Sequence, residues 1–283
     1  MKHFDDINDD EIRLVNRRRE PRKPWYGRWW FGVVMALLLV LLIVWAILRY
    51  ATPKTPVSDS KEEESTAVVP TTVPSEPASV LLSDTIINDV PLHLYTPVNV
   101  VSELCIGMPD TSDPALMLAF QAADIRADNH QIVGAFVLKG ELLSKGVAKK
   151  GFCAIIDGKL HLGMAESTSL FEEAIEKDGY FFRQYPLVSN GRMVENKPKG
   201  KAVRHALCEK DGRVVVVCSD ARESFHDFAQ ALVDMGIQHA LYLTGGSSCV
   251  FCRQADGQFE QEGNPYEWTP EANVNFIVWR NIQ

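Results

Sequence analysis

Residues 215–248, VVVCSDARESFHDFAQALVDMGIQHALYLTGGSS, contain a buried strand, a helix, a second buried strand and a glycine-rich loop in that order. The helix is expected over residues 225–235, because Ser224 followed three positions later by Asp227 is typical of a capped helix start. The apolar run HALYL, residues 239–243, then forms a short strand that ends at the loop TGGSS. This order predicts a helix packed on a sheet.

Hairpins and short apolar runs surround this stretch. Residues 204–219 form a hairpin that turns at Asp211-Gly212, and residues 152–163 form another around the sequence DGK. Residues 168–178 place apolar side chains on one helical face. Further strands are expected at 92–104, 115–120, 134–139, 180–188 and 276–279. The alternation of hairpins with one or two helices predicts an α+β fold, with a mixed or antiparallel sheet and a few packed helices.

The most apolar part of the chain lies near its start. Residues 29–48, WWFGVVMALLLVLLIVWAIL, carry no charge and are long enough as a helix to cross a hydrocarbon core of about 30 Å. Seven basic side chains and one acidic side chain lie in residues 13–28, so the positive-inside rule places the N-terminus in the cytoplasm. A cleaved signal peptide is the alternative, but the run is longer than a signal core and no small-x-small cleavage site follows it.

These features divide the chain into four parts. Residues 1–28 form a basic cytoplasmic tail, and residues 29–48 form one transmembrane helix. Residues 49–80 are a linker rich in Pro, Ser, Thr and Glu, which cannot bury enough apolar surface to fold. Residues 81–283 form an extracytoplasmic domain large enough for one core. The protein is therefore expected in the inner (cytoplasmic) membrane as a single-pass protein, with a periplasmic or otherwise extracytoplasmic C-terminal domain.

Composition excludes some classes of protein. The chain has 283 residues, 46% hydrophobic and 23% charged, with a formal net charge of −8. It is therefore not wholly disordered, and a nucleic-acid binder that relies on bulk positive charge is not expected. Six cysteines permit disulfides in an oxidising compartment, although Cys208 faces Val215 rather than Cys218 in the predicted hairpin. Cys249 and Cys252 lack the setting of a redox motif and a second ligand pair for zinc, so neither a metal nor a cofactor is expected.

None of the familiar catalytic motifs occurs in the sequence, but polar residues gather at the ends of predicted strands. Gln121 and Asp124 follow one strand, and Asp220 and Arg222 close a hairpin. Asp124, Asp220 and His226 are the candidates for a general acid or base. Asp220 could instead cap a turn, and His226 could simply be solvated.

Two arginines and one loop could bind a phosphate. Arg183 and Arg204 could each make two parallel hydrogen bonds to phosphate, or each could form only a structural salt bridge. The loop 244–248 could expose backbone N–H groups and small hydroxyls to a phosphate or a sugar hydroxyl. The alternative for this loop is a simple turn.

The stretch 215–248 resembles the C-terminal signature of the phosphodiester glycosidase family, in which a strand, a polar loop, a helix and an A-L-x-L strand precede Asp-Gly-Gly-x-Ser. Three further segments resemble family motifs in the same order along the chain, namely 120–141, 183–194 and 204–217. The family includes enzymes that remove N-acetylglucosamine from a phosphodiester, and bacterial proteins associated with exopolysaccharide biosynthesis.

The resemblance implies which residues form the site. Residues that match the family pattern are Gln184, Arg204, Gly245, Gly246 and Ser247. Thr244, which cannot ionise at any relevant pH, stands where the family has Asp, and Gln121 stands where it has Asn. Taken together with the polar residues at strand ends, the candidate catalytic residues are Asp124, Arg204 and Asp220. The candidate substrate-binding residues are Gln121, Arg183, Gln184, Arg222, Thr244, Gly245, Gly246, Ser247 and Ser248.

The expected function is hydrolysis of a sugar-1-phosphodiester in envelope or exopolysaccharide metabolism, with a carbohydrate or phosphosugar as ligand. Such a reaction needs arginines or N–H groups to stabilise the leaving phosphate, and a carboxylate or histidine to activate water. Two alternatives stay open: a catalytically degenerate domain that binds a glycan or phosphosugar, and a scaffold of a membrane complex. The membrane contact is expected through residues 29–48, and the oligomeric state is left open.

Overall fold

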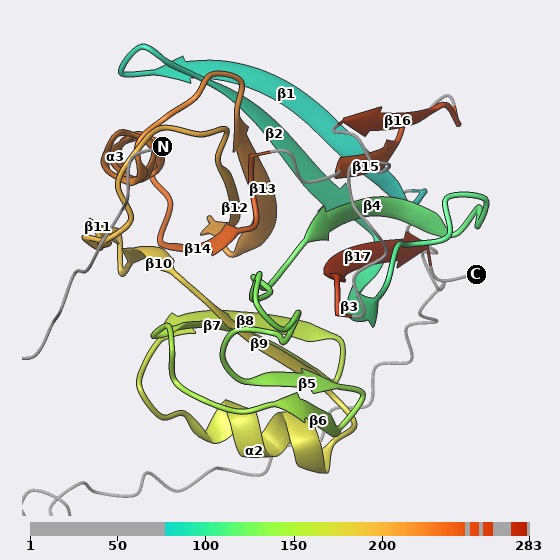
Figure 1. Cartoon of the computed structure of the whole chain (residues 1–283). Coiled ribbons are helices and arrows are strands. Elements are labelled where there is room, and N and C mark those ends of the chain that lie inside the picture. The colour runs from blue at the N-terminus through green and yellow to red at the C-terminus, as the bar shows by residue number, and fades with distance from the viewer. Residues whose placement is uncertain (1–76, 247–249, 255–256, 263–272, 282–283) are drawn as a thin grey trace, which may run out of the picture. The chain divides into compact units, whose positions relative to one another are not determined.

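The computed structural model describes residues 77–246, 250–254, 257–262 and 273–281, which lie in one compact unit (Figure 1). Within these ranges, no helix has both the length and the apolar character needed to cross a membrane. The predicted transmembrane segment 29–48 lies outside the described residues, as does the linker up to residue 76.

The largest layer is a seven-stranded sheet in which every neighbouring pair is antiparallel. One helix, α3 (Phe225–Asp234), covers one face of this sheet, and its side chains Phe228 and Leu232 pack with Leu187 and Val217. The strands in spatial order are β1 (Ser79–Ile87), β2 (Val90–Val98), β13 (Arg213–Ser219), β12 (His205–Lys210), β14 (His239–Leu243), β10 (Pro186–Ser189) and β11 (Arg192–Met193).

Two five-stranded antiparallel sheets complete the fold. The first consists of β16 (Phe259–Glu262), β15 (Val250–Arg253), β4 (Leu116–Gln121), β17 (Asn275–Asn281) and β3 (Val100–Ile106). The second consists of β6 (Glu141–Ser144), β5 (Phe136–Leu138), β9 (Tyr180–Gln184), β7 (Gly151–Ile156) and β8 (Lys159–Met164). Helix α2 (Ser169–Glu176) packs on this second sheet, at the bottom of Figure 1.

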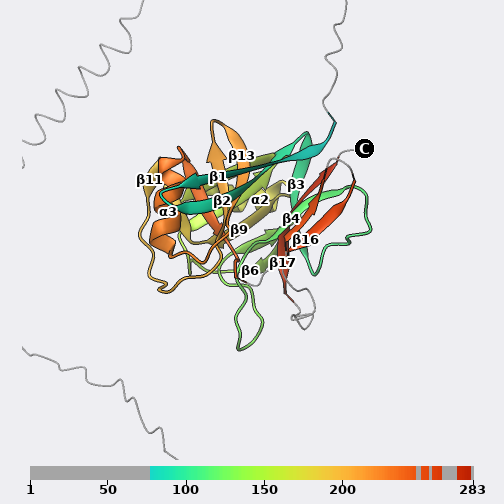
Figure 2. The same ribbon diagram turned by 90° about the horizontal axis from the view of Figure 1, so that it is seen from above.

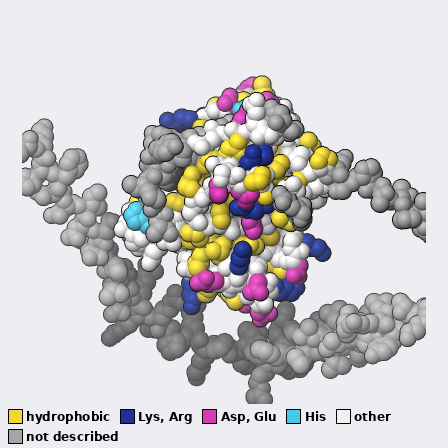
Figure 3. Space-filling model, turned by 90° about the vertical axis from the view of Figure 1, so that its right-hand side faces the viewer, with side chains coloured by type: hydrophobic (Ala, Val, Ile, Leu, Met, Phe, Trp, Pro, Cys, Tyr) yellow, Lys and Arg dark blue, Asp and Glu magenta, His cyan; other side chains and the backbone are white. Residues whose placement is uncertain are grey.

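The three sheets share one apolar core. Phe120 of β4, Phe182 of β9, Leu207 of β12 and Val216 of β13 are completely buried in the same cluster. Viewed from above, α3 and β11 lie at one side of this unit, and β4, β16 and β17 lie at the other (Figure 2). On the face shown in Figure 3, acidic and basic side chains intermingle within apolar surroundings, and the described residues there form no large area of one charge sign.

The predicted α+β class, both predicted helices and both predicted hairpins are confirmed. Thr168 and Ser224 cap the two helices, each by accepting a hydrogen bond from a backbone N–H of the first turn. Asp211 and Gly212 have φ angles of 50° and 70°, the left-handed pair that a two-residue hairpin turn requires. In this hairpin Cys208 pairs with Val215, as the register predicts.

Two predicted strands are in fact interrupted, because in each the chain passes from one sheet to another. The segment predicted as one strand, 92–104, breaks at Asn99, whose φ is +53°, and continues as β3 in the first five-stranded sheet. The segment 180–188 breaks at Tyr185, between β9 and β10. Strand β1 was not anticipated; it begins at Ser79, within the segment interpreted as linker, and pairs with β2 along its whole length.

Candidate active site

Asp124 lies just after the end of β4. There the Asn275 side chain of β17 makes the backbone hydrogen bonds that a paired strand would otherwise make. The Asn275 carboxamide oxygen accepts a hydrogen bond from Ala123 N at 2.8 Å, and its nitrogen donates to Ala123 O at 3.2 Å. Asn275 is completely buried, so these bonds hold the backbone that carries Asp124. The Asp124 side chain itself is 32% exposed.

Four side chains from separate segments meet at this point, and we call them the carboxylate cluster: Asp124, Lys149, Gln184 and Thr244. Asp124 Oδ1 accepts hydrogen bonds from Gln184 Nε2 at 2.9 Å and from Thr244 Oγ1 at 3.0 Å. Asp124 Oδ2 accepts from Lys149 Nζ. Three side-chain donors therefore hold one partly exposed carboxylate, and the carboxyl ends of β4, β9 and β14 converge on it.

Lys149 is the one member of the cluster that no pattern in the sequence predicts. Its side chain is only 5% exposed, donates to Gln184 Oε1 at 2.6 Å and lies 4.5 Å from the centroid of the Tyr185 ring. Burial lowers the pKa of the Lys149 ammonium, and the Asp124 carboxylate opposes that shift. The neighbouring Lys150 is exposed and pairs with Glu166, so the sequence offers no signal that distinguishes these two adjacent lysines.

Arg183 and Gln184 are adjacent on β9 and therefore point to opposite faces of the sheet. Gln184 enters the carboxylate cluster, whereas the Arg183 guanidinium donates to backbone carbonyls on the other side. The bonds go to Ala165 O at 2.7 Å, Glu166 O at 2.9 Å and Lys149 O at 3.2 Å. Arg183 thus fixes the backbone of the loop that carries Lys149.

We call the loop after β14, residues 244–248, the glycine loop. The backbone N–H groups of its first three residues hold it against the rest of the protein. Thr244 N donates to Gln121 O at 3.2 Å, Gly245 N to the Tyr242 hydroxyl at 3.1 Å and Gly246 N to Val203 O at 3.0 Å. The described N–H groups of this loop are therefore engaged within the protein. Ser247 and Ser248 lie outside the described residues.

Arg204 lies next to this loop, but its guanidinium is directed into the protein. It is buried, donates to Gly200 O and to Glu223 O at 2.8 Å each, and lies 4.2 Å from the centroid of the Phe225 ring. Val203, the residue before Arg204, accepts the hydrogen bond from Gly246 N. The bonds made by Arg204 therefore also fix the backbone segment against which the glycine loop packs. Gln121 contributes its backbone carbonyl, and its side chain is buried.

The His205 side chain contacts the backbone of the same loop. Its Nδ1 lies 3.2 Å from Thr244 O, and its ring packs edge-on against Phe120 with centroids 5.5 Å apart. Burial lowers the pKa of His205 to about 4, so its ring is neutral at pH 7.

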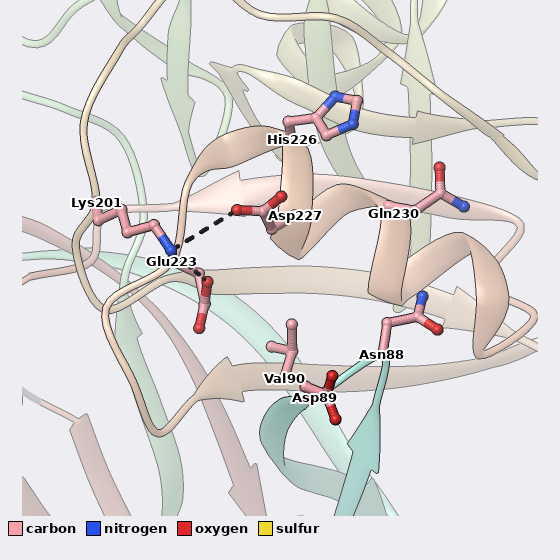
Figure 4. A pocket seen from close by; sticks show the side chains of 8 residues that line it. All are labelled: Asn88, Asp89, Val90, Lys201, Glu223, His226, Asp227 and Gln230. Atoms are coloured by element: carbon pink, nitrogen blue, oxygen red, sulfur yellow. Dashed lines mark ion pairs between the residues drawn. The ribbon is translucent and has the colours of Figure 1, made fainter.

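Three predicted site residues lie away from the carboxylate cluster. Asp220 is exposed at the end of β13, with its carboxylate 3.6 Å from His93 Nε2, and Arg222 donates to a backbone carbonyl at 2.9 Å. His226 lies 3.1 Å from Glu195 and lines a separate hollow of about 340 Å³ beside α3 (Figure 4). The structure thus joins Asp124, Gln184 and Thr244, places Gly245 and Gly246 beside them, and leaves Asp220, Arg222 and His226 elsewhere.

The carboxylate cluster at the converging ends of β4, β9 and β14 is the candidate site. The profile of the phosphodiester glycosidase family matches residues 118–278, more than half of the chain and a range that includes the whole carboxylate cluster. The chain belongs to the phosphodiester glycosidase family. Among the described residues, no group of three or more His, Cys, Asp or Glu side chains is arranged to hold a metal ion.

The solved structures that are similar to this one include one from zebrafish and one from Synechocystis. One is the catalytic domain of zebrafish N-acetylglucosamine-1-phosphodiester α-N-acetylglucosaminidase, auto-inhibited by its pro-peptide; it is 16% identical over 74% of this chain and 84% of that chain, with a TM-score of 0.48. The other is a hypothetical protein from Synechocystis, 15% identical over 72% of this chain and 62% of that chain, with a TM-score of 0.50. The second likeness shows a shared fold. No curated protein sequence matches this chain.

Proposed function

We propose that this chain hydrolyses a sugar-1-phosphodiester and that Asp124 is the catalytic carboxylate. The observation that supports this is the partly exposed Asp124 carboxylate, which three side-chain donors hold within the segment that matches the family. A carboxylate fixed in this way can accept a proton from water without losing its position.

The proposed reaction breaks the bond between the sugar C1 and the phosphate oxygen. The bonding electron pair leaves with the phosphate monoester, which is a good leaving group once its charge is stabilised. Water attacks C1, and its proton passes to Asp124 Oδ2 and then to solvent. The products are a reducing sugar and a phosphate monoester.

One observation favours a second function, which is binding without cleavage. The carboxylate cluster contains a single carboxylate, because Thr244 contributes a hydroxyl where the family has Asp. Most glycosidases use two carboxylates, one on each side of the scissile bond. A domain with this cluster could hold a phosphosugar or glycan and leave it intact.

Hydrolysis is tested with the full-length protein purified in mild detergent. The protein is incubated with a panel of sugar-1-phosphodiesters that includes esters of N-acetylglucosamine-1-phosphate, and released reducing sugar is measured. We expect release by the wild type and a loss of about 100-fold or more in Asp124→Asn. The matched control is Asp128→Asn, which removes an exposed carboxylate paired with Arg126 in the same loop. Saturable binding without release would support the second function.

We also propose that residues 29–48 anchor the chain in the inner membrane, with the N-terminus in the cytoplasm and the catalytic domain outside. The uncharged length of this segment and the basic residues before it support this topology. An envelope or exopolysaccharide phosphodiester would then be the accessible substrate. Reporter fusions placed after residue 28 and after residue 283 test the topology, and equal cytoplasmic signals from both would contradict it.

A further inference from the structure

A phosphodiester carries a negative charge, so the site needs a cation that can reach it. The two arginines that the sequence offers for this task are committed to backbone carbonyls. Arg183 donates to Lys149 O, Ala165 O and Glu166 O, and Arg204 donates to Gly200 O and Glu223 O. The glycine loop cannot replace them with its described N–H groups, because those groups bond within the protein.

Lys149 is the cation whose charged end enters the carboxylate cluster. Gln184 Oε1 holds the ammonium from the inner side at 2.6 Å, and the Tyr185 ring faces it at 4.5 Å. Asp124 supplies the remaining contact from the outer side, since its side chain is 32% exposed against 5% for Lys149. A ligand that reaches the cluster from solvent therefore meets Asp124 before it meets the ammonium of Lys149.

We propose that Lys149 binds the phosphodiester group and that, when it does so, it exchanges Asp124 Oδ2 for a phosphate oxygen. This inference rests on the proposed function and assigns the group in the site that recognises the phosphate. The buried ammonium has an anionic partner throughout the exchange, because one anionic oxygen replaces another on it. Gln184 and Tyr185 keep their contacts with Lys149 throughout.

The exchange couples recognition to catalysis. In the structure Asp124 Oδ2 is occupied by Lys149, whereas after the exchange it is free to accept a proton from the attacking water. Thr244 and Gln184 still hold Oδ1, so the carboxylate stays in place. A neutral glycoside offers no anionic oxygen to Lys149 and leaves Oδ2 occupied. Lys149 therefore selects sugars that carry a phosphodiester over uncharged glycosides of the same sugar.

The test measures binding of inorganic phosphate to the full-length protein in mild detergent by calorimetry. Lys149→Met should weaken phosphate binding by at least about tenfold, since it removes the cation. Asp124→Asn should tighten it by about tenfold or more, because it removes the anion that competes for Lys149. Lys149→Arg should bind better than Lys149→Met. Lys150→Met is the matched control, since it removes the adjacent exposed ammonium, and should bind as the wild type does.

If Lys149 and Asp124 form only a structural ion pair, phosphate binding by the variants will not follow this order. Unchanged phosphate binding in Asp124→Asn would overturn the proposal, as would wild-type binding in Lys149→Met or no binding by the wild type. Should Lys149→Met fail to fold, Asp124→Asn and Lys149→Arg still decide the question. An adventitious ion only, bound elsewhere, would leave every variant equal and would also overturn it.

Turnover separates this inference from the proposed function. If the wild type and Lys149→Met hydrolyse phosphodiesters equally, the function stands and the role of Lys149 is wrong. If the binding pattern holds but no phosphodiester is cleaved, Lys149 is a phosphate-recognition residue in a domain that binds without hydrolysis. The wild type should also prefer a sugar-1-phosphodiester over the p-nitrophenyl glycoside of the same sugar, and Lys149→Met should reduce that preference at least about tenfold.

Discussion

Lys149 Nζ lies 2.6 Å from Gln184 Oε1, and both side chains are buried although one of them carries a full charge. The Gln184 carboxamide uses both ends, since its oxygen holds the ammonium and its nitrogen donates to Asp124 Oδ1 at 2.9 Å. Gln184 therefore sets the spacing between the cation and the carboxylate. It belongs to β9, a strand of the core, so that spacing is tied to the rigid part of the fold.

Replacement of Gln184 by leucine should damage stability and activity together. The substitution leaves the Lys149 ammonium without its inner acceptor and removes one donor from Asp124. We expect the free energy of unfolding to fall by about 3 kcal/mol, as for other buried charges that lose a partner. Turnover should fall at least about tenfold. Denaturant unfolding and reducing-sugar release measure the two effects. Gln238→Leu, at an exposed position, is the control, and an equally small effect from both would show that Gln184 does not support the cluster.

Thr244 contributes a hydroxyl, and its methyl group is not required for the contact. Its Oγ1 donates to Asp124 Oδ1 at 3.0 Å and lies 3.3 Å from Ala122 O. Thr244→Val keeps the shape and removes the hydroxyl, so turnover should fall about tenfold, which is the effect of one hydrogen bond to a charged acceptor. Thr244→Ser keeps the hydroxyl and should retain most of the activity. Equal turnover in the two variants would contradict the contact.

Thr244→Asp places a second carboxylate within hydrogen-bond distance of Asp124. Two carboxylates this close share a proton, since both cannot ionise without strong repulsion. If the site is only degenerate, we expect turnover to rise, with a pH–rate profile that reports the shared proton. A pocket remodelled for binding would gain no turnover from the same substitution.

Gly245 has no room for a side chain. A Cβ at this position would lie 2.5 Å from Val203 O and 3.2 Å from the Tyr242 hydroxyl. Gly245→Ala should therefore push the loop away from Val203 and break the bond from Gly246 N. We expect a stability loss of about 1–3 kcal/mol, typical of overpacking, and weaker phosphate binding. Thermal unfolding and calorimetry measure both, and a wild-type melting temperature would show that the loop packs elsewhere.

Local patterns were sufficient for the hairpins and helices, because each depends on a few adjacent residues. Asp211-Gly212 supplies the left-handed turn, and Ser224 caps its helix through contacts within four residues. Strand breaks were not foreseen, because the change of sheet at Tyr185 depends on partners far away in the chain. Strand β1 was missed for a similar reason, since its stability comes from β2 and not from its own alternation.

The sequence likewise predicts some members of the carboxylate cluster and not others. Asp124, Gln184 and Thr244 could be proposed because they lie at strand ends within segments that resemble the family. Lys149 could not, because its burial results from contacts with Gln184 and from the loop that Arg183 holds. Asp220 also lies at a strand end, and β13 and β14 end at the same edge of the sheet, because His205 pairs with both Cys218 and Leu243. The strand β12 separates the two ends, and the Asp220 carboxylate lies beside His93 of β2, on the far side of β13 from Thr244. A position at a strand end therefore does not determine which side chains the residue meets.

His205 makes the stability of the fold depend on pH. Its folded-state pKa is about 4, below the unfolded value of 6.5, because burial disfavours the charged ring. Below pH 6.5 the unfolded chain binds a proton that the native protein excludes, so stability falls as pH decreases, until pH reaches about 4. The full loss is about 3 kcal/mol, the equivalent of the difference between the two pKa values.

His205→Gln should remove most of this dependence while it keeps a side-chain donor near Thr244 O. Urea unfolding at a series of pH values between 4 and 7 measures the free energy of unfolding for both proteins. We expect the variant to be less stable than the wild type at pH 7, where the packed ring is lost, and the two curves to approach each other at pH 4. His161→Gln, at an exposed position, controls for the loss of one histidine. Parallel curves for the wild type and His205→Gln would mean that the buried ring does not titrate in this range, and would contradict the prediction.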